Sequence, residues 1–154
     1  MASHERSNRL KEFCKDILAK DLSIRFAGVA NHMGHLIEGE YREGLKPLMN
    51  KQETEHYTMQ TVFRASTRET FESEIGKQRY ALAVYEKLIR ATIPFILIRS
   101  EDAKESNKKE IKQQYNEQNS ELLYLLVSFD SSSDVMSIVE DKILPLIEQY
   151  RKGS

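Results

Sequence analysis

The chain has 154 residues, of which 40% are apolar and 31% are charged, and its formal net charge is −1. This composition is typical of a globular protein, and the balanced charge argues against a broad nucleic-acid or anionic-membrane surface. No apolar run approaches the ~20 residues that span a bilayer, and the first residues lack the apolar region of a signal peptide. We therefore expect a single cytoplasmic domain over residues 1–154 that binds neither nucleic acid nor membrane.

An amphipathic helix is predicted first, over about residues 8–20, because apolar residues from Leu10 to Leu18 recur at helical spacing. A β-hairpin is predicted over residues 24–41, where two apolar runs flank the turn Asn31-His32-Met33-Gly34. Gly39 in the second strand of this hairpin indicates a bulge or the close approach of another group.

A second helix is predicted from Asn50 to about Arg68. Asn50 can accept a backbone N–H, and Glu53 follows three residues later, as in a capping box. Phe71 and Ile75 are expected to pack the turn after this helix.

Residues 78–98 predict a second hairpin with a turn at Glu86-Lys87, in which Pro94 requires an edge or a bulge. The nearly continuous apolar run of residues 122–129 is typical of a central strand covered on both faces. A final helix should follow Asp130, and Pro145 should kink it or split it near Asp141.

Residues 100–121 are the one break in composition, since charged and amide side chains dominate there. We expect a mobile polar insertion, because such a sequence buries too little apolar surface to offset the cost of ordering. The alternative is an arm that grips a partner through Ile111 and Tyr115.

Together the two hairpins and three helical segments predict an α/β (α+β) fold with a five-stranded, mainly antiparallel sheet and flanking helices.

The sequence offers little chemistry. His32 and His35 straddle the first hairpin turn, but strand alternation need not bring their imidazoles together, so no metal site is expected. No Gly-rich phosphate loop and no nucleophile elbow occurs. We therefore predict a protein without catalytic residues or a cofactor, and not an enzyme.

Several short motifs stand out in the first half of the chain. They are Ile24-Arg25-Phe26-Ala27-Gly28-Val29, Met33-Gly34, Ile37-Glu38-Gly39, Glu43-Gly44, Pro47-Leu48, Tyr57-x-Met59-Gln60 and Ser66-x-Arg68. These motifs resemble those of a group of uncharacterised small archaeal proteins, common in ammonia-oxidising archaea. The resemblance covers about residues 10–94 and implies no catalytic residue.

The order of the predicted elements also resembles that of roadblock and longin modules, and more distantly that of profilin-like domains. This second resemblance is one of topology. It implies a non-enzymatic scaffold that pairs with itself and binds partners such as a small GTPase.

Two functions follow as alternatives. The first is a homodimeric, roadblock-like interaction module with an interface of roughly 800 Å² per partner. Alternation along the first hairpin cannot turn all of its apolar residues to one core, so the proposed interface residues are Phe26, Val29, Leu36 and Ile37.

The second is a sensor of the PAS or profilin-like kind that binds a small molecule between the sheet and the second helix. The residues proposed to line its polar-rimmed pocket are Tyr57, Thr61, Tyr80, Tyr85 and Tyr124.

Overall fold

The structure is a computed structural model that describes residues 2–98 and 120–151. Its elements in chain order are α1 (Ala2–Leu18), β1 (Ile24–Asn31), β2 (Leu36–Tyr41), α2 (Lys51–Arg68), the 3-10 turn η1 (Glu69–Phe71), α3 (Glu72–Ile75), β3 (Ala81–Val84), β4 (Leu88–Ile98), β5 (Ser120–Asp130), α6 (Val135–Ile138), the π-helical η2 (Val139–Ile143) and α7 (Leu144–Arg151). The predicted insertion lies outside the described residues, apart from Ser120 and Glu121, which begin β5.

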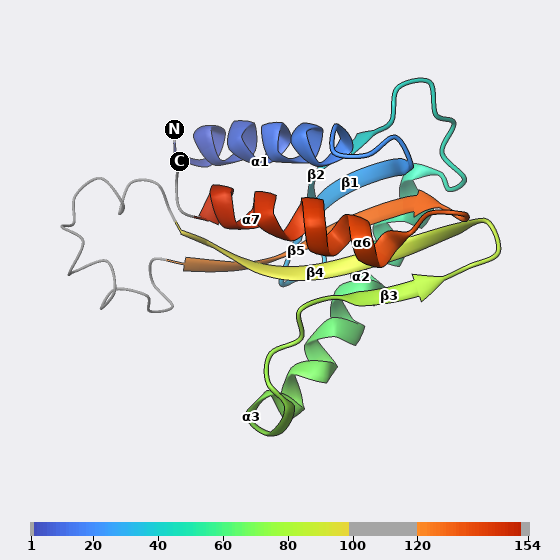
Figure 1. The fold of residues 1–154 in the computed structure, drawn as a ribbon. Helices are drawn as coiled ribbons and strands as arrows, with labels where there is room; N and C mark the ends of the chain where they lie inside the picture. Colours follow the sequence, from blue (N-terminus) through green and yellow to red (C-terminus); the bar gives the residue numbers. More distant parts are fainter. Residues whose placement is uncertain (1, 99–119, 152–154) are drawn as a thin grey trace.

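The described strands form one five-stranded antiparallel sheet in the order β2-β1-β5-β4-β3 (Figure 1). The predicted fold class is confirmed, and so are both hairpins. β5 lies in the centre of the sheet, and its residues from Leu123 to Phe129 are all buried. The continuous apolar character of that strand follows from this position, because each of its faces is covered by a helix layer.

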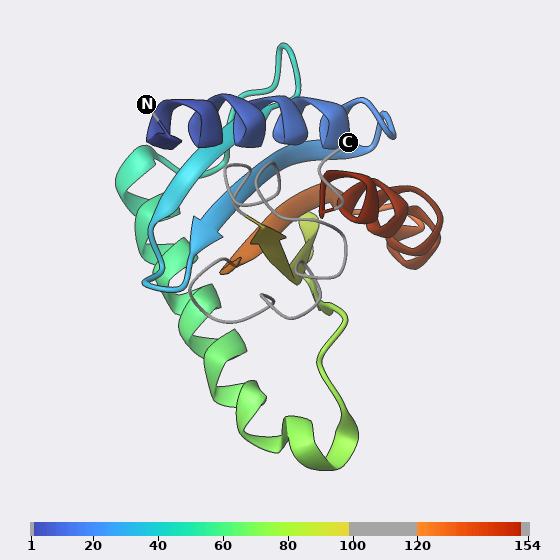
Figure 2. The same ribbon diagram turned by 90° about the vertical axis from the view of Figure 1, so that its left-hand side faces the viewer.

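Helices cover both faces of the sheet (Figure 2). On one face, α1 and the segment from α6 to α7 bury the larger core, in which Phe13, Cys14 and Ile17 of α1 are almost fully inaccessible. On the other face, α2 covers a smaller core around Val62, Ala65 and residues of β1 and β5. The sheet is therefore the middle layer of three, and α2 is the only described helix longer than one turn on its face.

The first hairpin depends on its glycines. Gly34 in the turn has a φ of 86°, a conformation that favours glycine. The ring of Phe26 lies over Gly28 and Gly39, so closely that a Cβ built on either glycine would come within 3.0 Å of a ring atom. The close approach predicted at Gly39 is thus confirmed, and the bulge lies elsewhere, at the register shift between Val29 and Ala30.

Gly28→Ala is expected to lower the free energy of unfolding by about 1–3 kcal/mol, because the new methyl group would overpack the site under the Phe26 ring. Urea unfolding measures this change. The double variant Gly28→Ala/Phe26→Leu should lose less free energy of unfolding than the two single variants lose together, because the smaller side chain leaves room for the methyl group. Additive losses would contradict the assigned contact.

The helix ends follow the chemistry expected of their sequences. Asn50 accepts from the Glu53 backbone N–H, and the Glu53 carboxylate accepts from the Asn50 N–H, so the predicted capping box is confirmed. The last helix is split near Asp141, as predicted, by the π-helical η2, which ends two residues before Pro145. A proline has no N–H and its ring crowds the carbonyl four residues earlier, which a wider π turn accommodates.

Candidate functional site: an exposed apolar stripe on α2

The four residues predicted at a dimer interface all pack within the monomer. Val29 has no exposed surface and Ile37 packs with it in the core under α1. Phe26 is buried against the ring of Tyr41, and Leu36 packs on the α2 side of the sheet. Within the monomer these apolar residues are therefore divided between the two faces of the sheet.

The five residues predicted to line a ligand pocket lie in three different places. Tyr57 and Tyr85 meet on the face of the sheet that α2 covers, where their hydroxyl oxygens are 2.9 Å apart. The buried Thr61 of α2 donates a hydrogen bond to the Tyr57 carbonyl. Tyr80 lies on the opposite face and donates to Glu140. Tyr124 is buried in β5. The structure therefore does not bring these five side chains together at one place.

Tyr124 has a structural role in the α2 side of the core. It is 1% exposed, and its hydroxyl donates to the Glu69 carboxylate over 2.7 Å. Burial, together with the hydrogen bond to the Glu69 carboxylate, raises the pKa of Tyr124 above its ordinary value, so the phenol stays a donor at neutral pH.

Tyr124→Phe is expected to lower the free energy of unfolding by about 1–2 kcal/mol, because it removes a hydrogen bond to a charged group. Chemical denaturation at pH 7 checks this. Tyr80→Phe is the matched control, since it removes a similar bond to Glu140 near the surface and should cost less. An equal cost for the two variants would show that the burial of Tyr124 does not strengthen its bond.

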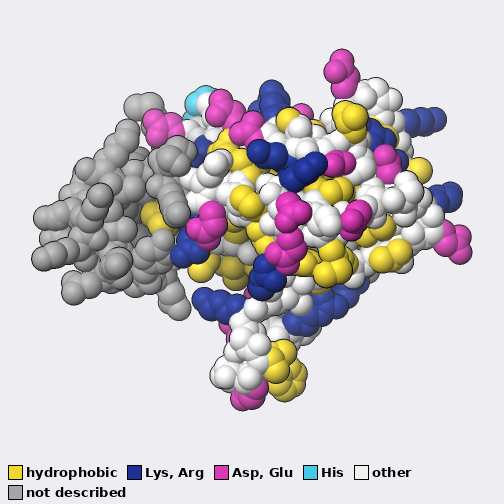
Figure 3. Space-filling view, viewed as in Figure 1, with side chains coloured by type: hydrophobic (Ala, Val, Ile, Leu, Met, Phe, Trp, Pro, Cys, Tyr) yellow, Lys and Arg dark blue, Asp and Glu magenta, His cyan; other side chains and the backbone are white. Residues whose placement is uncertain are grey.

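The most unusual surface of the described residues is the outer side of α2 and its continuation. Met59, Phe63, Phe71 and Ile75 are spaced by multiples of four residues and are exposed, Phe63 by 54% and Ile75 by 83%. We call these four residues the α2 stripe. The expectation that Phe71 and Ile75 pack a turn is wrong, because both side chains point to solvent. Figure 3 shows apolar side chains at the lower tip of the molecule, where Figure 1 places α3.

The outermost strand of the sheet also carries an exposed apolar residue. β3 has only four residues, and Val84 at its end is 76% exposed. In Figure 1, α2 emerges below β3 and leads to α3 beyond the sheet. An edge strand of this kind presents unpaired backbone groups that another chain can use.

Two arginines and two tyrosines form a polar cluster between α2 and the β3–β4 hairpin. The guanidinium carbon of Arg90 lies 4.0 Å from the centre of the Tyr57 ring, and that of Arg64 lies 5.9 Å from it. Neither arginine forms an ion pair with another described residue. Burial and the contact with Tyr85 raise the pKa of Tyr57, so the cluster carries the positive charge of its arginines.

A sequence signal for the stripe existed. Met59, Phe63, Phe71 and Ile75 recur at multiples of four residues in the sequence, while the buried residues of α2 are Thr58, Thr61, Val62 and Ala65. In the sequence the two sets look like one face of mixed polarity, because the threonines that contact the sheet are polar and the residues that face solvent are apolar. The exposed apolar set was missed for this reason.

No protein-family model matches the chain, and no curated protein matches it either. The resemblance to archaeal proteins therefore stays an inference from sequence motifs. Solved structures do match in fold. The gliding protein MglB from Thermus thermophilus has a TM-score of 0.60 at 9% identity, covering 96% of this chain and 91% of that one.

MglB from Myxococcus xanthus also has a TM-score of 0.60, at 14% identity, covering 96% of this chain and 89% of that one. A roadblock/LC7 domain from Streptomyces avermitilis has a TM-score of 0.58 at 8% identity, covering 92% of this chain and 94% of that one. None of the described helices is both long and apolar enough to cross a membrane.

The three similar structures and the observed sheet show that the chain has the α+β fold of roadblock/LC7 domains, as its order of elements predicted.

Proposed function

We propose that this protein is a non-enzymatic interaction module that forms a homodimer through the α2 stripe and the edge of β3. The observation that carries the proposal is the stripe itself. Phe63 is more than half exposed on α2, whose opposite side is buried against the sheet, and Phe71 in the following η1 is more than half exposed as well. Water-exposed aromatic side chains in a row are costly for a monomer and typical of protein interfaces.

The two surfaces suit a symmetric contact. A helix face that repeats its apolar residues along one line can pack against a copy of itself in the antiparallel sense. Edge strands related by the same twofold axis could then pair and extend the sheet across the dimer. We expect such an interface to bury roughly 800 Å² per partner.

The comparisons support self-assembly only by analogy. One of the similar structures is described as MglB with a tetrameric arrangement; it has a TM-score of 0.57 at 11% identity, covering 97% of this chain and 93% of that one. We propose that this chain also assembles with itself, in the cytoplasm, and that the dimer then scaffolds a further protein, for which a small GTPase is the candidate that the roadblock resemblance implies.

Sedimentation equilibrium of the purified protein over a range of micromolar concentrations tests the dimer. The expected result is a monomer–dimer equilibrium with a dissociation constant in that range. Native mass spectrometry of the same sample distinguishes the scaffold from a small-molecule sensor, since the scaffold should carry no retained ligand. A protein that stays monomeric at high micromolar concentration would refute the proposed assembly.

A further inference from the structure

The outer edge of β4 is only partly covered. β4 has 11 residues, but β3 has four, and the pairing of the two strands ends at Ala81 and Thr92. Beyond Thr92 no described strand lies outside β4, whereas on its inner side β4 pairs with β5 along its whole length. Half of a long, buried strand is therefore an open edge within the described part of the chain.

The backbone of this open edge points outward at alternate residues. Tyr85 donates its N–H to the Leu88 carbonyl, so Leu88 turns its backbone polar groups toward β3. The pairing of β4 shows no register shift, and backbone groups alternate along an antiparallel strand, so Pro94 and Ile96 also turn theirs outward. Pro94 has no N–H to lose, which explains why a proline is tolerated inside β4.

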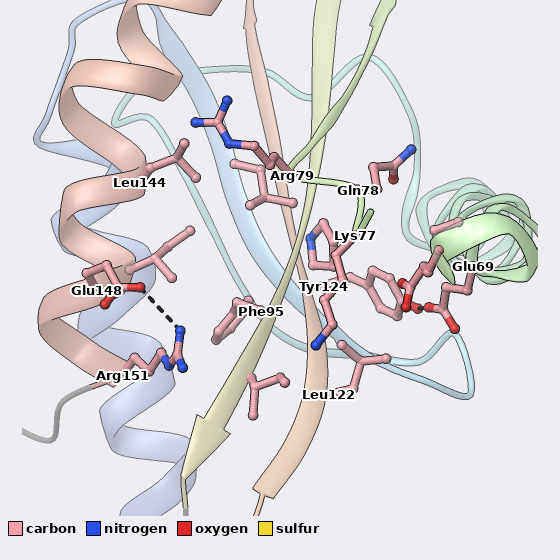
Figure 4. A pocket seen from close by; sticks show the side chains of 16 residues that line it. Glu69, Lys77, Gln78, Arg79, Phe95, Leu122, Tyr124, Leu144, Glu148 and Arg151 are labelled. Atoms are coloured by element: carbon pink, nitrogen blue, oxygen red, sulfur yellow. Dashed lines mark hydrogen bonds and ion pairs between the residues drawn. The ribbon is translucent and has the colours of Figure 1, made fainter. Parts of the chain in front are cut away.

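A groove runs along this edge. It has a volume of about 520 Å³ and lies between η1 and α3 on one side and α7 on the other, with β4 and β5 between them (Figure 4). None of the four residues of the α2 stripe lines it, and neither does any residue of β3. The groove is therefore distinct from the surface proposed for the dimer.

The two walls of the groove differ in chemistry. On the α7 side, Phe95, Leu144 and Ile147 give an apolar wall, and the one ion pair that Figure 4 draws there joins Glu148 to Arg151. On the α2 side, carboxylates dominate. Glu69 and Glu72 outnumber the single Lys77 there.

Neither carboxylate of the α2 wall is neutralised by a described basic residue. Among the described residues, Glu69 accepts a hydrogen bond from the Tyr124 hydroxyl and forms no ion pair, and Glu72 forms no ion pair either. Arg79 at the mouth of the groove is held by Glu140 on the α6–α7 segment. The α2 wall thus offers negative charge to whatever enters.

We propose that this groove binds an extended peptide segment of another protein, which adds to the open edge of β4 as an antiparallel strand. Side chains of an added strand alternate between the two faces of the sheet. Those on one face would meet Glu69 and Glu72 and should be basic, and those on the other would meet Phe95 and Ile147 and should be apolar. The backbone N–H and carbonyl of Ile96 supply the hydrogen bonds of the pairing.

The test uses fluorescein-labelled eight-residue peptides and the complete protein. A peptide of alternating lysine and valine should bind, as measured by fluorescence anisotropy, and a peptide of alternating glutamate and valine should bind at least about tenfold more weakly. In an antiparallel pair, the residue opposite Ile96 has its side chain on the same face as Ile96 and its N–H toward β4. N-methylation of the lysines should therefore weaken binding about tenfold, and N-methylation of the valines should not.

Two variants of α3 locate the site. Glu72→Lys should abolish the preference for the basic peptide, whereas Glu74→Lys, two residues along α3 and outside the groove, should leave it intact. Hydrogen exchange followed by NMR adds a direct readout. The amide of Ile96 should exchange at least about tenfold more slowly when the peptide is bound, because it gains a hydrogen bond.

Three results would overturn the proposal. The first is equal binding of the N-methylated and unmethylated peptides. The second is an equal effect of the Glu72 and Glu74 variants while both remain folded by circular dichroism. The third is unchanged exchange at Ile96 with the peptide bound, which would place the peptide elsewhere on the molecule.

Discussion

Val29→Glu is expected to unfold the protein rather than to yield a folded monomer. Val29 has no exposed surface and lies in the core between β1 and α1. A carboxylate placed there has no partner and must either stay charged or take up a proton, at a cost of several kcal/mol in both cases. Since small domains are stable by only about 5–15 kcal/mol, most of the native population should be lost.

Far-UV circular dichroism and thermal unfolding measure the outcome. Met33→Glu is the matched control, because Met33 lies in the turn of the same hairpin and is 57% exposed. It should change the free energy of unfolding by less than about 0.5 kcal/mol. If the Val29→Glu protein is folded and monomeric, Val29 belongs to the dimer interface that the sequence alone suggested and not to the monomer core.

Phe63→Glu is expected to abolish self-association while the monomer stays folded. Phe63 is 54% exposed in the monomer, so a glutamate there remains hydrated until two subunits meet. In the proposed dimer the charge would be buried against an apolar helix face without a partner. Central aromatic residues commonly contribute about 2–4 kcal/mol to an interface, so the dissociation constant should rise by at least about 30-fold.

Sedimentation equilibrium of the variant and the wild type at the same concentrations gives the comparison. Met136→Glu is the control, since Met136 is 59% exposed on α6 and lies outside the α2 stripe. It should associate as the wild type does. If Phe63→Glu and wild type have the same dissociation constant, the stripe is not the interface.

The sequence by itself determined the local structure and much of the topology. The capping box at Asn50 fixes where α2 begins, because it satisfies backbone groups within one turn of the helix. The turns at Gly34 and at Glu86-Lys87 define the two hairpins, since they depend on neighbouring residues alone. The unbroken apolar run of β5 identified the central strand without any knowledge of its neighbours.

Which residues face a partner could not be predicted in the same way. Alternation assigns Phe26 and Val29 to opposite faces of a strand, but it does not say whether a helix or a second subunit covers each face. That depends on α1 and α2, which lie on opposite sides of the sheet. The exposed stripe on α2 was hidden for a related reason, because the threonines of that helix pack on the sheet while Met59 and Phe63 face solvent.

The tertiary structure alone also decided where the sheet is open. The sequence required an edge or a bulge at Pro94, and the structure gives the edge, on a strand that is otherwise interior. The reason is the difference in length between β3 and β4, which leaves the outer side of Pro94 and Ile96 without a described strand. The length of β4 follows from its pairing with the distant β5, so the residues around Pro94 alone cannot reveal how far β4 extends past β3.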